Sequence, residues 1–462
     1  MRFRMKTVVA IIVVVILIAF GWIGWHQHNH FNRNVTINGV NVGGMTVDEA
    51  FDRVKSDHQD NKVYLDGKLI YDGADTQATM TSTDRSKVER ALAQQRTILP
   101  SRKNYQLQIN PDQNNQTRLD KITSTVTSTV NKENRGRRAP HDAYALLKND
   151  KVTVVAAQSG TKIDEQRIKR ELNQQRNNSV IQLNSHHEQP LSANSTTVQH
   201  EKAQLKKLLN RHVTYQVEQK QYRFGTDDVI TSATYQHGHY QFNTTAVNKR
   251  IAKINRRQAT LGRKFKFKTH SGKVIETSQA GTYGWRISKE RAGQSLARAI
   301  ANGTKKVEAK QDIYGIGYNK RGTGYGVTSN DGIGDTYAEL SIADQHAWFY
   351  KDGKCVFEAD VVTGKNSRKE DQTPLGVWYI MYQASPSVLK GTDDSGSNYS
   401  SKVQFWSQFT NSGCGFHDAS WRHNWSKTAY LNDGSSGCAN MHPVDAGPAY
   451  RALQVNEPVV VY

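Results

Sequence analysis

The sequence predicts a multidomain protein in which an N-terminal transmembrane helix precedes two α+β strand-helix repeat domains and a C-terminal mainly-β domain. Three observations lead to this fold class: an uncharged apolar run near the N-terminus, two similar strand-turn-helix segments in the middle, and a last quarter of strand patterns without long amphipathic helices. The chain has 462 residues but only 36% hydrophobic content, which favours several small domains over one large core.

The first element is the apolar run at residues 7–25. As a helix it would extend about 28 Å, enough to cross the hydrocarbon core of a bilayer. Three basic residues precede it, so the positive-inside rule predicts a cytoplasmic tail at residues 1–6 and an extracytoplasmic location for the rest of the chain. A cleaved signal peptide would show the same positive start and apolar core. We favour a membrane anchor, because the run is long, ends in Trp22 and Trp25, and is followed by no clear small-residue cleavage site.

The charge of the chain bears on its partners. Lys and Arg outnumber Asp and Glu by 62 to 42, a formal net charge of +20 spread along the chain. Outside a membrane, this argues against nucleic acid as a partner and makes anionic cell-wall polymers a candidate. The alternative is that the charge only keeps an extended protein soluble.

The first strand pattern starts at Val35 and ends in a glycine turn, and a helix is expected after it. Thr46 and Glu49 have the spacing of a capping box for this helix. Ala50, Phe51 and Val54 supply its apolar stripe.

Two segments farther along, residues 151–172 and 273–300, resemble each other. Each is typical of a strand, a glycine turn and a helix, with Asp164 or Ser288 at the N-cap. We interpret them as an internal duplication that builds a binding or spacing array, although two copies also allow coincidence. The predicted boundaries of the two domains are residues 26–205 and 206–314.

The connections are predicted from composition. Residues 174–197 carry few large apolar side chains and predict exposed loops or connecting segments. Residues 315–334 contain seven glycines and predict a linker before the last domain, residues 335–462.

The last domain reads as β-rich. Strand patterns at residues 347–350 and 355–362 are joined by an Asp-Gly turn, which predicts a hairpin. Another strand is expected at residues 377–382 and a short helix at residues 444–453. Cys355 alternates with apolar neighbours, so we expect it in the core.

The chemistry-bearing motif lies near the C-terminus. Ser435-Ser436-Gly437-Cys438-Ala439-Asn440 places one thiol in a small-residue loop, and His417 precedes the loop by seventeen residues. A thiol attacks as the thiolate, and a neighbouring imidazole both lowers its pKa and returns a proton to the leaving amine. The pattern therefore predicts a cysteine nucleophile with a histidine base. The sixteen histidines form no HExxH or other recognised ligand spacing, so neither metal nor cofactor is expected.

This arrangement resembles the signature of L,D-transpeptidase catalytic domains, the YkuD-like family, over about residues 335–462. Residues 343–350, Val362-Thr363-Gly364 and Thr373-Pro374-Leu375-Gly376 resemble the rest of that domain. Residues 140–144 with the Gln158 turn, and residues 281–300, resemble the peptidoglycan-binding domain that often precedes it.

The resemblance implies a peptidoglycan stem tetrapeptide as donor. Cys438 would attack the carbonyl of the third residue, D-Ala would leave, and an acceptor amine would resolve the thioester into a 3→3 cross-link that serves cell-wall biogenesis and cell shape. His417 would act as base and then as acid. Backbone N–H groups of Ser436, Gly437 and Cys438 would form the oxyanion hole. A carbonyl near Asp418 is expected to orient the imidazole, and the other supporting candidates are Ser435 and Asn440.

One position departs from the family. Ser436 stands where the family most often has histidine, but His417 is present, so we expect activity to survive. His423 and His442 could compensate, although ordinary surface or site-rim positions are favoured for both.

Three further features have two interpretations. Cys414 could form an inhibitory disulfide with Cys438, but a small buried side chain is favoured. Trp421, Trp425 and Tyr430 could line a substrate groove or belong to a core. The thioester could also be hydrolysed, which would give an L,D-carboxypeptidase, and a non-catalytic cell-wall-binding protein is the alternative from another class.

Overall fold

The computed structural model describes residues 2–95, 97, 99–113, 115–392 and 397–462. These residues form two compact units, which are described separately. Residues 1–144 and 155–195 make the first unit, and residues 145–154 and 196–462 make the second. Met1, the first residue of the predicted cytoplasmic tail, lies outside the described residues.

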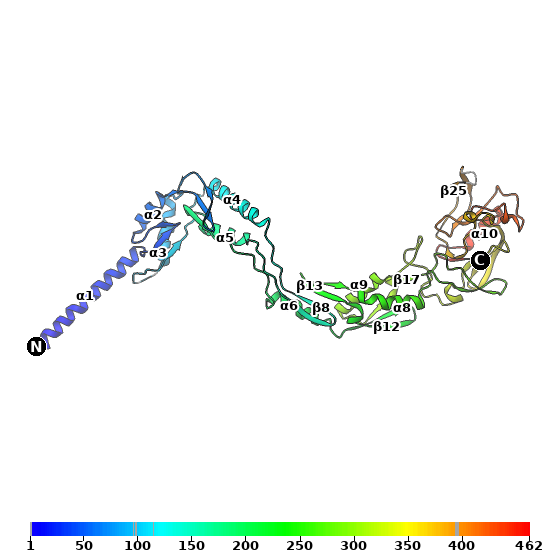
Figure 1. The fold of residues 1–462 in the computed structure, drawn as a ribbon, viewed down its shortest axis with the longest axis horizontal. Coiled ribbons are helices and arrows are strands. Elements are labelled where there is room, and N and C mark those ends of the chain that lie inside the picture. Colours follow the sequence, from blue (N-terminus) through cyan, green and yellow to red (C-terminus); the bar gives the residue numbers. More distant parts are fainter. Residues whose placement is uncertain (1, 96, 98, 114, 393–396) are drawn as a thin grey trace. The chain divides into compact units, whose positions relative to one another are not determined.

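The first unit begins with helix α1 (Arg2–Asn29), which contains the predicted span (Figure 1). Its stretch Thr7–Asn29 is long and apolar enough to cross a membrane, and none of the most apolar window is buried in the protein. A signal sequence meets the same criteria. The apolar helix is thus present, with anchor and signal peptide as its two interpretations.

The rest of the first unit combines four helices with short strands. The helices are α2 (Val47–Lys55), α3 (Arg85–Gln95), α4 (Gln116–Asn134) and α5 (Glu165–Gln175). The strands are β1 (Val35–Ile37), β2 (Val40–Asn41), β3 (His58–Gln59), β4 (Lys62–Leu65), β5 (Lys68–Asp72), β6 (Thr76–Gln77), β7 (Tyr105–Leu107) and β10 (Val180–Leu183). They pair as β2-β1-β7, β10-β4-β5 and β3-β6.

The predicted capping box of α2 is confirmed. The Thr46 side chain accepts from the backbone N–H of Glu49, and the Glu49 carboxylate accepts from the N–H of Thr46 at 2.8 Å. Ala50, Phe51 and Val54 are buried, as the apolar stripe predicts.

The loop predicted at residues 174–197 is partly wrong. Strand β10 lies within it and pairs in parallel with β4. Ile181 and Leu183 are buried in a core that also contains Ile122 and Ile168. The segment is short and polar, so its strand depends on a partner more than a hundred residues away.

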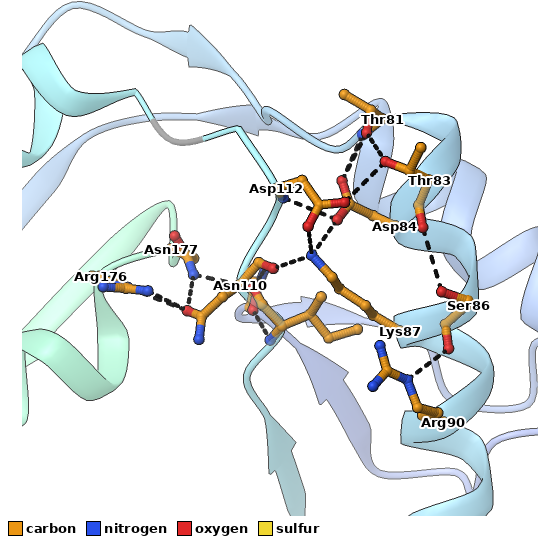
Figure 2. Close-up of polar contacts among 12 residues, drawn as sticks. Thr81, Thr83, Asp84, Ser86, Lys87, Arg90, Asn110, Asp112, Arg176 and Asn177 are labelled. Atoms are coloured by element: carbon orange, nitrogen blue, oxygen red, sulfur yellow. Dashed lines mark hydrogen bonds and ion pairs between the residues drawn. The ribbon is translucent and has the colours of Figure 1, made fainter.

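A polar network joins α3 to the segment after β7 (Figure 2). The Lys87 ammonium donates to Asp84 and Asp112, each at 2.6 Å, and to the carbonyl oxygen of Asn110 at 2.8 Å. Asn177, just beyond α5, donates to the Asn110 side chain at 3.1 Å. The Asp84 side chain is fully buried, and this pairing compensates for its lost hydration.

The second unit begins with an α+β part. Its helices are α6 (Thr196–Lys206), α7 (Thr226–Val229), α8 (Asn248–Gln258) and α9 (Lys289–Asn302). Its strands are β8 (Tyr144–Lys148), β9 (Lys151–Val155), β11 (His212–Val217), β12 (Lys220–Gly225), β13 (Ser232–Gln236), β14 (His239–Asn243), β15 (Lys266–Lys268), β16 (Val274–Glu276), β17 (Arg286–Ile287), β18 (Lys306–Glu308) and β19 (Ile313–Tyr314). They pair as β12-β11-β18, β14-β13-β8-β9, β15-β16 and β17-β19.

The two similar segments show the predicted caps. Asp164 accepts from Arg167 N–H at 2.9 Å, and Ser288 accepts from Arg291 N–H at 3.3 Å. The strand and helix of the first segment, however, do not form one packed body. Strand β9 pairs with β8 in the second unit, whereas α5 buries Ile168 in the first unit. The duplication and the domain boundaries stay predictions.

The predicted glycine linker is a packed connection in the structure. Gly324 has a φ of +67°, and a Cβ there would lie 2.3 Å from the Tyr283 hydroxyl oxygen. Tyr379 donates its hydroxyl to the Ile316 carbonyl oxygen at 2.9 Å and accepts from Asn319 N–H at 2.7 Å. The glycines therefore permit close contact within this connection.

The C-terminal part is mainly β. Its strands are β20 (Tyr337–Ser341), β21 (His346–Lys351), β22 (Lys354–Val362), β23 (Gly376–Tyr379), β24 (Tyr382–Ala384), β25 (Ser387–Thr392), β26 (Asn398–Val403), β27 (Trp406–Gln408), β28 (Gly415–Asp418), β29 (Ala439–Met441) and β30 (Pro458–Val461). Nine strands form one mixed sheet in the order β23-β30-β20-β21-β22-β29-β28-β27-β24, and β25-β26 is a separate hairpin. Helix α10 (Pro443–Ala452), the predicted short helix, packs against β28, β22 and β21.

The predicted hairpin is confirmed as β21-β22. Asp352 and Gly353 have φ values of +47° and +76°, which suit the mirror-image turn that the strand twist favours. The prediction that Cys355 belongs to the core is wrong, because its side chain is exposed. A register shift between Phe349 and Tyr350 interrupts the alternation of the two strands here.

Candidate active site

The sheet brings the predicted nucleophile and base to one face. His417 on β28 lies opposite Asn440 on the parallel strand β29. Cys438 precedes β29 by one residue and lies two residues before Asn440. Because side chains alternate along a strand, Cys438 and Asn440 point to the same side, and both line one cavity together with His417.

Two hydrogen bonds hold the His417 ring. Its Nδ1 lies 2.9 Å from the carbonyl oxygen of Asp418, the orienting carbonyl expected from the sequence. Its Nε2 lies 3.0 Å from Nδ2 of Asn440. The Asp418 carboxylate is engaged elsewhere and accepts from the backbone N–H groups of Gln404 and Phe405 at 2.8–3.0 Å. Asp418 thus acts on the imidazole through its backbone.

The ring is also enclosed by aromatic side chains. Trp406, opposite His417 on β27, has its ring centroid 5.7 Å away, and Trp421 stacks at 5.8 Å. Burial lowers the pKa of His417 below its ordinary value, so the neutral imidazole is favoured.

The thiol is also neutral in this structure. The Cys438 Sγ donates to the carbonyl oxygen of Gly413 at 3.6 Å. Burial raises the pKa of Cys438 to about 12, and Cys414 adds to the shift. Desolvation therefore opposes the thiolate in this structure.

The nucleophile loop is braced from within. Ser435 donates its hydroxyl to the Cys438 carbonyl oxygen at 2.6 Å and accepts from Gly437 N–H at 3.1 Å. Of the three predicted oxyanion donors, the Gly437 N–H is thus engaged, which leaves those of Ser436 and Cys438 as candidates. Gly437 has a φ of +113°, and a Cβ there would lie 2.8 Å from the Cys414 Sγ.

Two upstream motifs brace the loop from outside. The buried Thr373 hydroxyl donates to the Gly437 carbonyl oxygen and accepts from Gly364 N–H, both at 2.9 Å. Gly364 also forms a bridge with Ser435. The motifs quoted for their resemblance therefore support the nucleophile loop physically.

The cavity above the nucleophile has a volume of about 680 Å³. Hairpin β25-β26 supplies part of its wall, including Tyr399. The described lining residues include three cations, Lys365, Lys390 and Arg422, and no carboxylate. The lining therefore favours an anionic ligand. The remaining described lining residues are Leu389, Gly391, Ser401, Ser412, Gly413, His417, Trp421, Gly434, Ser435, Ser436, Cys438 and Asn440.

The three groove candidates lie differently. Trp421 lines the cavity and is 45% exposed. Trp425 instead stacks on His442 at 3.7 Å, and the Tyr430 carbonyl accepts from Asn366 N–H at 2.8 Å. Neither is among the described residues that line the cavity.

The other side chains considered from the sequence lie around the site. Ser436 is exposed and lines the cavity, whereas His423 is exposed elsewhere. Cys414 is buried and its thiol is free, as is that of Cys438. In the described part of the chain, no group of three or more His, Cys, Asp or Glu side chains could hold a metal ion.

Sequence reasoning missed Arg422, whose side chain is only 8% exposed. Its Nε donates to Oδ1 of Asn440 at 3.0 Å, and its Nη1 donates to the Asp433 carbonyl oxygen at 2.6 Å. Its position five residues after His417 was the only signal, and spacing alone could not reveal the contact with Asn440.

Comparisons with known proteins bear on this geometry. The model of the L,D-transpeptidase catalytic domain, YkuD, matches residues 335–461. The catalytic domain of the Enterococcus faecium L,D-transpeptidase, studied by NMR, is 36% identical over 28% of this chain and 97% of its own length. The chain belongs to the L,D-transpeptidase family.

Two further solved structures are similar to this chain. A crystal structure of a variant of the E. faecium L,D-transpeptidase is 26% identical over 56% of this chain and 98% of that chain, with a TM-score of 0.43. The E. faecium catalytic domain acylated by ertapenem is 36% identical, and it has a TM-score of 0.26, as does the free domain. A search of curated proteins finds no match.

Proposed function

We propose that this protein is a peptidoglycan L,D-transpeptidase that uses Cys438 as nucleophile and His417 as base. The observation that carries the proposal is the shared face of two parallel strands, from which both side chains reach one cavity. The cationic lining supports it further, because stem peptides carry carboxylates that Lys365, Lys390 and Arg422 would attract.

The proposed first half-reaction acylates the enzyme. The Nε2 lone pair of His417 first leaves the hydrogen bond from Asn440. Cys438 then transfers its proton to Nε2 as sulfur bonds to the third-residue carbonyl carbon of a stem tetrapeptide. The developing oxyanion lies against the backbone N–H groups of Ser436 and Cys438. The carbon–nitrogen bond then breaks, and His417 returns the proton to the departing D-Ala amine.

The second half-reaction resolves the thioester. An acceptor amine attacks the thioester carbonyl, the carbon–sulfur bond breaks, and the amine proton returns through His417 to Cys438. One amide bond replaces another, and the product is a 3→3 cross-link. Water in place of the amine would give the L,D-carboxypeptidase reaction.

The test uses the full chain in detergent with a disaccharide tetrapeptide as substrate. Mass spectrometry of the products separates the functions: a dimer indicates transfer and a tripeptide indicates hydrolysis. The absence of both products would favour the non-catalytic cell-wall-binding protein and would contradict the proposal. Cys438→Ala should abolish product and also the mass adduct with ertapenem, a compound that acylates the E. faecium domain.

We further propose a single-pass topology, with residues 1–6 inside and the catalytic part outside at the cell wall. The apolar helix and the preceding basic residues support this orientation. Cysteine-labelling of residues introduced on either side of the helix, with a membrane-impermeant reagent on intact cells, would test it. Labelling of the N-terminal position, or release of a shortened chain, would contradict it.

We also propose that the α+β repeats bind or reach into the wall and that anionic wall polymers attract the chain. The net charge of +20 supports the second point. Cosedimentation with purified walls at rising salt should show a steep loss of binding, and salt-independent binding would contradict it.

A further inference from the structure

We propose that Arg422 is a positioning residue that acts through Asn440 to hold His417 in the tautomer whose Nε2 is unprotonated. The inference rests on the proposed function, because it concerns the base of that reaction. It assigns a chemical purpose to a nearly buried arginine, which is costly to keep away from water.

The orientation of the Asn440 amide follows from its contact with Arg422. A guanidinium only donates hydrogen bonds, so the amide atom 3.0 Å from Nε of Arg422 is the acceptor oxygen, Oδ1. The amide nitrogen, Nδ2, must then be the atom 3.0 Å from Nε2 of His417. Amide oxygen and nitrogen are otherwise easily exchanged in a structure, and here the arginine removes that ambiguity.

The tautomer of His417 follows from both of its hydrogen bonds. An amide nitrogen donates and does not accept, so Nε2 of His417 carries the lone pair. A backbone carbonyl accepts and does not donate, so Nδ1, 2.9 Å from the Asp418 oxygen, carries the hydrogen. The two ends of the ring independently indicate the same neutral tautomer.

Contacts with Asp433 hold the Arg422 guanidinium in place. Its Nη1 donates to the Asp433 carbonyl oxygen at 2.6 Å, while the exposed Asp433 carboxylate lies 3.7 Å from the same nitrogen. The planar guanidinium therefore spans the Asp433 carbonyl and the Asn440 amide. This rigid guanidinium prevents the Asn440 amide from turning, which a flexible side chain could not do.

The charges around His417 agree with this assignment. Arg422 disfavours the imidazolium, and Asp418 on the same strand favours it. The Asp418 carboxylate is neutralised in part by the N–H groups of Gln404 and Phe405, and the Cys438 thiol on the neighbouring strand is uncharged. Burial is the main cause of the lowered pKa of His417, and the charge of Arg422 adds to it.

Loss of Arg422 would free the Asn440 amide to turn. Its oxygen would then face His417 and accept a hydrogen from a protonated Nε2, which stabilises the imidazolium. The base form would be populated only at higher pH. The expected effect is an upward shift of the acid limb of the pH–rate profile by about one unit, and a loss of up to about tenfold in rate at the acid end.

The experiment measures acylation of Cys438 by ertapenem in the full chain in detergent, from about pH 5 to about pH 9. Arg422→Gln should shift the acid limb to higher pH. Arg422→Lys, which keeps the charge but loses the planar guanidinium, should shift it less. Asn440→Asp should shift it further, because a carboxylate stabilises the imidazolium directly. Arg451→Gln, which removes an exposed arginine from α10, is the matched control and should leave the profile unchanged.

A second measurement needs no variant. Nitrogen-15 spectroscopy of His417 in the unmodified protein should show a protonated Nδ1 and an unprotonated Nε2 at neutral pH. The opposite tautomer would overturn the inference, and so would an Arg422→Gln profile equal to that of Arg451→Gln. Failure of the unmodified protein to be acylated would contradict the proposed function instead, while the tautomer measurement would still stand.

Discussion

Replacement of Thr373 by valine removes one hydroxyl from beneath the nucleophile loop and leaves the shape of the side chain almost unchanged. That hydroxyl donates to the Gly437 carbonyl oxygen and accepts from Gly364 N–H, both at 2.9 Å. Thr373 is 3% exposed, so water cannot replace either hydrogen bond. Each orphaned buried group costs about 1–3 kcal/mol, and the two together cost roughly 2–6 kcal/mol.

Hydrogen–deuterium exchange of the peptide spanning residues 432–441, in the full chain, is the suitable assay, because it reports local opening in a multidomain protein. Since 1.4 kcal/mol corresponds to a factor of ten, protection should fall by about 30-fold to 20,000-fold. Acylation by ertapenem should also be slower in the Thr373→Val variant, because Cys438 follows Gly437 directly.

Thr373→Ser is the matched control, because it keeps the hydroxyl and loses one methyl group. Its cost should stay near about 0.8 kcal/mol, the contribution of a single buried carbon. If Thr373→Val changed protection no more than Thr373→Ser, the hydroxyl would not brace the loop and the reasoning would be refuted.

Three further predictions follow from the site. The pH–rate profile of acylation should be a broad plateau. The lowered pKa of His417 keeps the imidazole in its base form at pH values below its ordinary pKa of 6.5, and the Cys438 pKa of about 12 keeps the thiol protonated. An acid limb above pH 6.5 would contradict this prediction. Gly437→Ala should lose about 1–3 kcal/mol in thermal unfolding, since its φ of +113° and the Cys414 Sγ 2.8 Å from a Cβ both oppose a side chain. Adding Cys414→Ala should restore only the steric part, and full restoration would rule out backbone strain. Cys414→Ala alone should keep acylation, and loss of activity in a folded variant would overturn the assignment of that buried thiol as structural.

Much of the local structure could be predicted from the sequence. The capping box at Thr46 and Glu49 and the turn at Asp352 and Gly353 depend on residues a few positions apart, so their pattern suffices. The active-site motif could also be recognised from the sequence, because a family signature consists of residue types at fixed spacings.

Predictions that needed a distant partner fared worse. Cys355 was placed in the core by alternation, but a register shift with the neighbouring strand leaves it exposed. Strand β10 was missed because, among the described strands, it pairs with the distant β4 alone. Composition predicts a connection at residues 315–334 but not its close packing, because that packing involves distant residues such as Tyr283.

The sequence by itself identified the candidate pair Cys438 and His417, the apolar N-terminal helix and the family, because each depends on contiguous or regularly spaced residues. Only the tertiary structure decided the protonation of that pair. Burial keeps the thiol and the imidazole neutral, and Arg422 acts on His417 through Asn440. Desolvation and hydrogen-bond direction depend on which groups meet in space, and no spacing along the chain encodes them.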